Sequence, residues 1–151
     1  IWGDGDEREV LERRVRDEGL SNVVFKGRVE KKYIPSIVSR ADANLMHGTP
    51  GPLFRFGVSP NKMFDYFAAG KPILMDFETK YNPVEQYQAG IILNSLSGEA
   101  AAQTLQRMAK WPEEEYARNC QNARRAAGDF DFKKLTDKLL NIIESLPERK
   151  S

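Results

Sequence analysis

The sequence predicts an α/β fold, a doubly wound parallel sheet followed by a group of C-terminal helices. Short apolar segments with the length of strands alternate with helical segments as far as residue 93. This alternation is typical of parallel sheets that carry helices on both faces. Glycine and proline residues mark the turns between the segments, and the sequence from Ser97 onward is helical in character up to a polar tail.

The individual elements follow from hydrophobic periodicity and from turn signals. Ile1 and Trp2 have the character of the end of a buried strand, which leads into a glycine turn at Gly3-Asp4-Gly5. Further strands are expected at residues 23–25, 43–46, 73–75 and 91–93. Helices are expected at residues 6–19, 30–40, 60–69, 82–89, 98–110, 112–127 and 132–146. Residues 47–56 contain two glycines and two prolines and are expected to form a loop.

Length and the first residues bear on domain organisation. The chain has 151 residues, a common size for one domain. We therefore expect residues 1–146 to form a single domain and residues 147–151 a polar tail. Because the sequence opens inside a strand, we expect this domain to be truncated at its N-terminus, with a preceding domain absent.

Composition argues against several classes of partner. The 23 basic and 22 acidic residues give a net charge of +1, so no overall field favours nucleic acid. The single cysteine, Cys120, rules out an intramolecular disulfide and is typical of a cytoplasmic protein. No segment has the roughly 20 apolar residues that a membrane-spanning helix needs. The lone His47 has no Cys, His or acidic partner at metal-ligand spacing, so we expect no metal and no cofactor.

Residues 59–72 predict one short helix together with its start and its stop. Ser59 is the expected N-cap and Pro60 the first helical residue, while Gly70 and Pro72 end the helix. The packing side is expected to carry Met63, Phe64 and Phe67, and the opposite side Ser59, Lys62, Asp65 and Tyr66.

The N-terminus of this helix is a candidate anion site. The first N–H groups of a helix have no intrahelical partner and carry a partial positive charge. Gly57, Val58, Ser59 and Lys62 are therefore suited to a phosphate or diphosphate. Asp65, beyond the first turn, is suited to accept hydrogen bonds from sugar hydroxyls. A diphosphate beside a diol indicates a nucleotide, and the alternative from these residues alone is a capped helix whose polar side faces water.

The segment around this helix has a distinctive sequence. Residues 54–74 read FRFGVSPNKMFDYFAAGKPIL. They resemble the donor-binding segment of retaining GT-B glycosyltransferases of family 4 (glycosyl transferases group 1), especially bacterial polysaccharide enzymes with a Ser-Pro-Asn-Lys signature. The family's other segments are matched in order by residues 1–5, 22–29, 34–35, 41–43 and 128–132. The resemblance thus covers nearly the whole chain.

This resemblance implies a Rossmann-like domain that forms the C-terminal half of a GT-B fold. The implied activity is transfer of a hexosyl or N-acetylhexosaminyl group from a nucleotide diphosphate sugar, UDP-linked by family habit, with retention of configuration. The acceptor would be a saccharide or lipid-linked molecule in cell-surface polysaccharide synthesis, such as capsule or O-antigen, and would bind through the absent N-terminal domain. The fragment alone is therefore expected to be inactive. Peripheral association of the full-length protein with the inner face of the plasma membrane belongs to the same expectation.

The resemblance also implies roles for individual residues. Lys62 is expected to stabilise the charge that develops on the diphosphate. The other expected donor-binding residues are Gly3, Gly5, Arg28, Val29, Arg55, Gly57, Val58, Ser59, Asn61 and Asp65. Val29 would contact the base, and Asp65 matches the second acid of the family's Glu-x7-Glu motif, which binds the ribose. Gly57 stands where the first acid is expected, so the contact with the donor sugar has no assigned residue.

Alternative interpretations remain open from the sequence. Gly57 in place of the first acid favours a noncatalytic module that binds a nucleotide sugar. A nucleotide-sugar 2-epimerase would share the fold, but its acid and histidine arrangement is not apparent. His47, at the end of a predicted strand, could reach a ligand or could serve only loop packing.

Overall fold

The computed structural model describes residues 1–49, 51–93, 95 and 97–146. The chain divides into two compact units, the first covering Ile1–Ile34 and the second beginning at Pro35. We describe each unit by itself. The polar tail predicted at residues 147–151 lies outside the described residues.

The first unit consists of one helix and a pair of adjacent extended segments. Helix α1 (Arg8–Asp17) is shorter than the predicted 6–19, and its Val10 and Leu11 side chains are exposed. A short 3-10 helix, η1 (Lys31–Tyr33), follows later in the chain. The strand predicted at residues 23–25 is wrong, because these residues form no strand, and an isolated parallel bridge joins Trp2 to Gly27 two residues further on.

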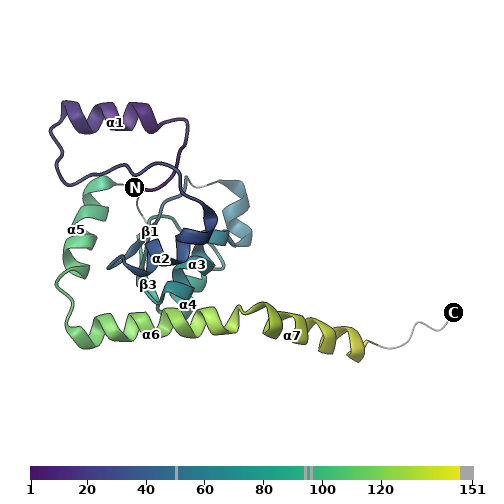
Figure 1. Cartoon of the computed structure of the whole chain (residues 1–151). Coiled ribbons are helices and arrows are strands. Elements are labelled where there is room, and N and C mark those ends of the chain that lie inside the picture. The colour runs from purple at the N-terminus through teal and green to yellow at the C-terminus, as the bar shows by residue number, and fades with distance from the viewer. Residues whose placement is uncertain (50, 94, 96, 147–151) are drawn as a thin grey trace. The chain divides into compact units, whose positions relative to one another are not determined.

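A parallel three-stranded sheet forms the centre of the second unit (Figure 1). Its strands β1 (Asn44–Met46), β2 (Ile73–Met75) and β3 (Gly90–Ile92) are arranged in the order β1-β2-β3. The register pairs Met46 with Met75 and Met75 with Ile92. The predicted α/β class with a parallel sheet is confirmed, since both strand pairs are parallel and helices connect the strands.

Helices precede and connect the strands, most of them near the positions that the sequence predicts. The elements before and between the strands are α2 (Ile34–Ser39), η2 (Pro52–Phe56), α3 (Asn61–Ala69) and α4 (Pro83–Tyr87). The 3-10 helix η2 lies inside the segment that was predicted to be only a loop, and the predicted helix 30–40 consists of η1 followed by α2. Asn82 starts α4, because its side-chain oxygen accepts a hydrogen bond from the Val84 N–H at 3.1 Å.

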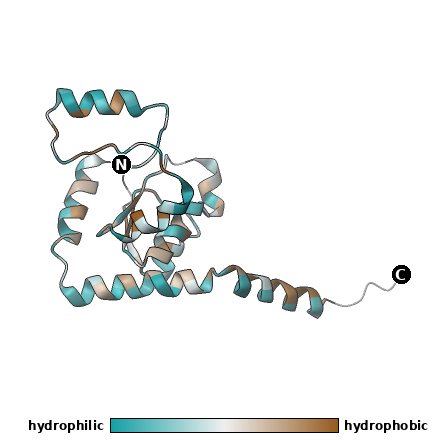
Figure 2. Ribbon diagram, in the orientation of Figure 1, coloured by the Kyte–Doolittle hydropathy of each residue, from teal (hydrophilic) through white to brown (hydrophobic). Residues whose placement is uncertain are grey.

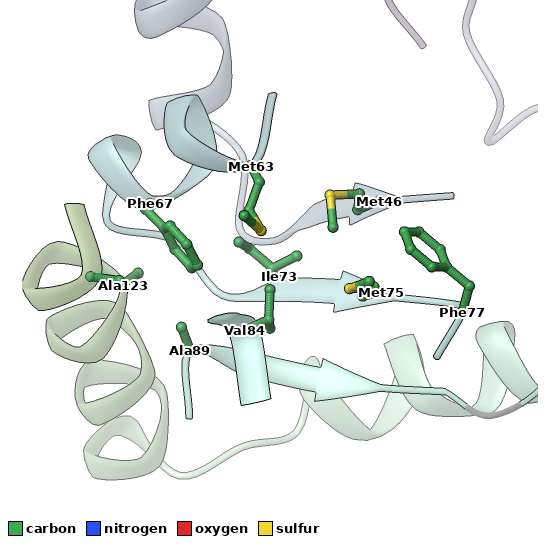
Figure 3. Close-up of a cluster of buried hydrophobic side chains, with 10 residues drawn as sticks. Met46, Met63, Phe67, Ile73, Met75, Phe77, Val84, Ala89 and Ala123 are labelled. Atoms are coloured by element: carbon green, nitrogen blue, oxygen red, sulfur yellow. The ribbon is translucent and has the colours of Figure 1, made fainter. Parts of the chain in front are cut away.

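The hydrophobic core lies between the sheet, α3, α4 and α6 (Figure 3). Met63 and Phe67 from α3 are completely buried and pack with Ile73 and Met75 of β2 and Val84 of α4. The Phe67 ring is stacked with Phe130 at 6.2 Å and tilted against Tyr87 at 6.4 Å, measured between ring centroids. This core fixes α3 against the sheet.

Three further helices follow the last strand. They are α5 (Gly98–Met108), α6 (Glu113–Asp129) and α7 (Phe132–Ser145), close to their predicted bounds. Helix α6 contributes Ala123 and Ala126 to the core. Helix α7 buries none of its residues, although much of its ribbon is apolar in Figure 2. Among the described residues, no helix combines the length and apolar character needed to cross a membrane.

Candidate functional site

The carboxyl ends of β1 and β2 carry a paired histidine and aspartate. His47 follows Met46, and Asp76 follows Met75. Because Met46 and Met75 are partners in the sheet register, the two following residues emerge side by side. The His47 Nδ1 and an Asp76 carboxylate oxygen are 2.5 Å apart, and the other carboxylate oxygen accepts the Gly48 N–H at 3.2 Å. Asp76 is buried, at 8% exposure, so its carboxylate is held in place by these two contacts.

The N-terminus of α3 lies near this pair. Ser59 was predicted to be the N-cap, and this is wrong: Pro60 occupies that position in extended conformation, and no side chain caps the helix. The helix therefore begins one residue later, and the Met63 N–H makes the first turn by donating to the Pro60 carbonyl at 2.9 Å. The N–H groups of Asn61 and Lys62 precede that bond and have no carbonyl partner within the helix. The absence of a side-chain cap leaves them available to an anion.

Gly57 positions the chain that leads into α3. Its backbone has φ of 108°, a region that side-chain-bearing residues rarely adopt. A Cβ atom there would lie 2.9 Å from the Cβ of Tyr81. The preceding turn is held by the Phe54 carbonyl, which accepts the Thr79 hydroxyl at 2.7 Å. An acidic side chain, as expected at this position from the sequence motif, therefore does not fit this conformation.

These elements enclose a pocket of about 290 Å³, which we call the α3 pocket. It is lined by Met46, His47, Gly48, Phe54, Gly57, Val58, Ser59, Pro60, Lys62 and Phe77. The structure thus brings together the four residues that the sequence proposed for an anion, Gly57, Val58, Ser59 and Lys62. It adds His47 from the end of β1. Lys62 is exposed, and no carboxylate of the described chain lies within ion-pair distance of its ammonium group.

A larger pocket of about 760 Å³ lies at the ends of β2 and β3, and we call it the β2 pocket. It is lined by Gly51, Phe54, Arg55, Asp76, Phe77, Glu78, Thr79, Lys80, Asn82, Glu85, Ile92 and Ser95. Phe54 and Phe77 line both pockets, and their ring centroids are 4.7 Å apart. The two pockets are therefore neighbours on either side of this aromatic pair. Arg55, which the sequence placed at the donor, lines the β2 pocket.

The exposed side of α3 differs from its predicted composition at one residue. Tyr66 was predicted to lie on the polar side, but it is half-buried and packs against the core. Burial raises the pKa of the Tyr66 phenol, and the neighbouring Asp65 carboxylate raises it further. The neutral hydroxyl donates to the Leu45 carbonyl at 3.4 Å. Asp65 is half-buried, and no cation of the described residues pairs with it.

The remaining residues that the sequence predicted to bind the donor belong partly to the first unit and partly to the second. Asn61 is the first residue of α3 and is exposed. Gly3 and Arg28 belong to the first unit, where the Gly3 N–H donates to the Gly27 carbonyl at 2.9 Å. This bond places the Gly3 turn beside the segment that continues into Arg28, which is exposed, and Val29, which is half-buried. Gly5 lies just beyond, and its carbonyl accepts the Arg8 N–H at 3.0 Å.

Asp76 is the residue of the site that sequence reasoning missed. Its signal was present, because it is the first polar residue after the apolar strand Ile73–Met75. Ligands of open α/β folds bind beyond the carboxyl ends of the strands. Asp76 follows one predicted strand and His47, the single histidine of the sequence, follows another. The Asp76 carboxylate was therefore a candidate partner for His47. Among the described residues, no group of three or more His, Cys, Asp or Glu side chains could hold a metal ion.

Comparison by sequence gives no match, since no protein-family model and no curated protein matches the chain. Solved structures do match. HepE from Anabaena in complex with UDP-glucose has 18% sequence identity and a TM-score of 0.71, over 96% of this chain and 40% of HepE. Sucrose-phosphate synthase from Thermosynechococcus elongatus has 18% identity and a TM-score of 0.74, over 93% of this chain and 34% of the synthase.

A third solved structure, WaaG, is described as a glycosyltransferase involved in lipopolysaccharide biosynthesis. It has 19% identity and a TM-score of 0.68, over 97% of this chain and 38% of WaaG. The fold of this chain is accordingly the C-terminal half of a GT-B, Rossmann-like fold. The chain spans between 34% and 40% of the length of these three proteins.

Proposed function

We propose that the chain is the nucleotide-sugar-binding part of a GT-B glycosyltransferase. The observation that carries this proposal is the α3 pocket, where an uncapped helix N-terminus and the Lys62 side chain line one cavity. The fold shared with HepE, which has been solved with UDP and with UDP-glucose, supports the same class of ligand. We propose a UDP-linked sugar as the donor.

In this proposal the diphosphate lies at the N-terminus of α3. The free N–H groups of Asn61 and Lys62 and the partial charge of the helix favour an anion there. Gly57 and Val58 also line this pocket, so their backbone borders the proposed diphosphate site. The Lys62 ammonium adds a full positive charge at the same pocket.

The other parts of the donor have separate places in this proposal. Asp65 lies one turn beyond Lys62 on α3, and its carboxylate, which pairs with no cation of the described residues, is suited to accept hydrogen bonds from the ribose hydroxyls. The transferred sugar occupies the β2 pocket, which adjoins the α3 pocket across Phe54 and Phe77. Arg55 lines that pocket. Gly3, Gly5, Arg28 and Val29 are proposed to contact the base and the adjoining nucleotide.

The proposed chemistry is cleavage of the bond between the sugar and the diphosphate. Negative charge then develops on the departing nucleoside diphosphate, and positive groups aimed at it lower the barrier. Helix α3 and Lys62 provide such groups at fixed positions. We propose retention of the anomeric configuration and an acceptor of saccharide or lipid-linked type in cell-surface polysaccharide synthesis, with the acceptor bound by a further domain. Peripheral association with a membrane is part of this proposal.

A noncatalytic nucleotide-sugar-binding module is the second candidate. It is favoured by Gly57, whose conformation leaves no space for the acid that the motif places there. Release of UDP by the complete protein in the presence of a lipid-linked acceptor supports the enzyme. Binding of the nucleotide sugar without such release supports the module.

Replacing Lys62 by alanine tests the diphosphate site. The Lys62→Ala chain is expected to bind UDP about tenfold to a hundredfold more weakly, because a hydrogen bond to a charged group contributes roughly 1.5–3 kcal/mol. Its affinity for uridine should stay unchanged, since uridine has no phosphate. Isothermal titration with both ligands measures the difference. Lys110→Ala, which removes an exposed lysine after α5, is the matched control and should bind UDP as the original chain does. Equal losses for UDP and uridine would contradict a phosphate contact.

A further inference from the structure

We propose that His47 is a ligand-binding residue of the α3 pocket and that Asp76 positions it. In this proposal the His47 Nε2–H donates to the diphosphate linker of the bound nucleotide sugar. The proposal rests on the proposed function, because it adds a contact to the same donor. It differs from the sequence expectation, in which His47 packed in a loop or reached a ligand without a partner.

The His47 and Asp76 side chains differ in exposure, and this difference indicates a different role for each. The Asp76 side chain is 11% exposed, whereas the His47 side chain is 65% exposed. Asp76 is therefore enclosed, and both of its oxygens are engaged by His47 and by the Gly48 N–H. His47 contributes little buried area, so packing does not account for its position at the rim of the pocket.

The contact with Asp76 determines which ring atom of His47 is free. A carboxylate only accepts, so the Nδ1 that faces it carries a proton, and the proposed donation from Nε2 as well involves the imidazolium form, in which both ring nitrogens are donors. The ring is then held with Nε2 directed away from Asp76, and no group of the described chain forms a hydrogen bond with Nε2. A histidine that a carboxylate orients in this way is suited to present Nε2 to a ligand.

The charges around His47 favour an anionic ligand. Asp76 faces it from the end of β2, and Lys62 lines the same pocket from α3. Among the described residues that line the α3 pocket, Lys62 and His47 are the ones whose side chains can carry a charge. Asp76 is buried and lines the neighbouring β2 pocket rather than the α3 pocket, so the α3 pocket presents the helix N-terminus, Lys62 and His47. A protonated His47 adds positive charge where the diphosphate of the donor would lie.

The test is the affinity of the full 151-residue chain for UDP-glucose, measured by isothermal titration and compared with its affinity for uridine. UDP-glucose carries the diphosphate linker, whereas uridine has no phosphate. His47→Gln should bind UDP-glucose about tenfold more weakly than the original chain, because it loses a hydrogen bond to a charged group. Uridine binding should be the same in both chains.

Asp76→Asn tests the positioning role separately. It keeps His47 but weakens the interaction that orients the ring, so UDP-glucose affinity should fall severalfold while uridine affinity stays unchanged. The decisive variant is His47→Gln, because His47 is exposed and its replacement leaves the core intact. An unchanged affinity for UDP-glucose in His47→Gln would overturn this inference while leaving the proposed function in place. An equal loss for uridine would also overturn it, and absence of UDP-glucose binding by the original chain would overturn both.

Discussion

Replacing Gly90 by alanine is expected to prevent the second unit from folding. Gly90 is the first residue of β3 and pairs with Ile73 of β2, and its backbone has φ of 157°. A Cβ atom at this position would lie 1.8 Å from the Ile73 carbonyl oxygen and 2.7 Å from the Ile73 nitrogen. Backbone atoms of a buried strand cannot move aside, so β3 must separate from β2. We expect a loss of more than about 4 kcal/mol in the free energy of unfolding.

The matched control for this substitution is Gly98→Ala. Gly98 begins α5, and a Cβ atom there meets no other atom within 4 Å. Its replacement should change the free energy of unfolding by about 1 kcal/mol or less. Urea unfolding followed by circular dichroism compares the two variants. If Gly90→Ala unfolds at the same urea concentration as Gly98→Ala, the described packing of β2 and β3 is incorrect.

Replacing Phe67 by alanine is expected to cost about 3–5 kcal/mol of folding free energy. Phe67 is completely buried and lies on the side of α3 that faces the sheet (Figure 3). Its ring contacts the rings of Tyr87 and Phe130, which come from α4 and from the end of α6. Truncation leaves a cavity where these elements meet, because none of them can close it without moving the sheet. The position of α3, and with it the α3 pocket, depends on this contact.

Phe132→Ala provides the control, because Phe132 is 88% exposed at the start of α7. The same loss of an aromatic ring there should change stability by less than about 1 kcal/mol. The midpoint of thermal or urea unfolding measures the stability of each variant. A Phe67→Ala chain as stable as Phe132→Ala would show that α3 does not pack on the sheet as described.

Much of the fold could be predicted because its elements carry strong local signals. Strand β2 has the predicted bounds, since Ile73–Met75 is an apolar run between Pro72 and the polar Asp76. Helix α3 has its predicted end, since Gly70 ends it and Pro72 follows. These signals depend only on the residues themselves, so no information on distant contacts was needed.

The predictions that were wrong have a different origin. In each case, contacts or backbone conformation in the folded chain outweigh the preference of the residue type. Residues 23–25 have the composition of a strand, but they form no ladder, and the bridge beside them joins Trp2 to Gly27. Ser59 is a favourable N-cap by residue type, yet Pro60 takes that position with an extended backbone. Tyr66 was predicted to lie on the polar side because of its hydroxyl group. In the structure its ring packs against the core, and its hydroxyl donates to the Leu45 carbonyl of β1.

The candidate site was only partly visible in the sequence for the same reason. Gly57, Val58, Ser59 and Lys62 are close in sequence, so helix geometry alone placed them together. The pairing of His47 with Asp76 depends on the sheet register, which joins residues 29 positions apart. The β2 pocket also depends on long-range packing, because Arg55 and Glu85 reach it from different elements.

The most direct test of the central claim is a crystal structure of this chain with bound UDP-glucose. Our account predicts density for the diphosphate at the N-terminus of α3, in contact with the N–H groups of Asn61 and Lys62 and with the Lys62 ammonium group. It also predicts the ribose hydroxyls at Asp65 and the glucose in the β2 pocket. An α3 pocket without the diphosphate, with UDP-glucose bound elsewhere on the chain, would contradict the account.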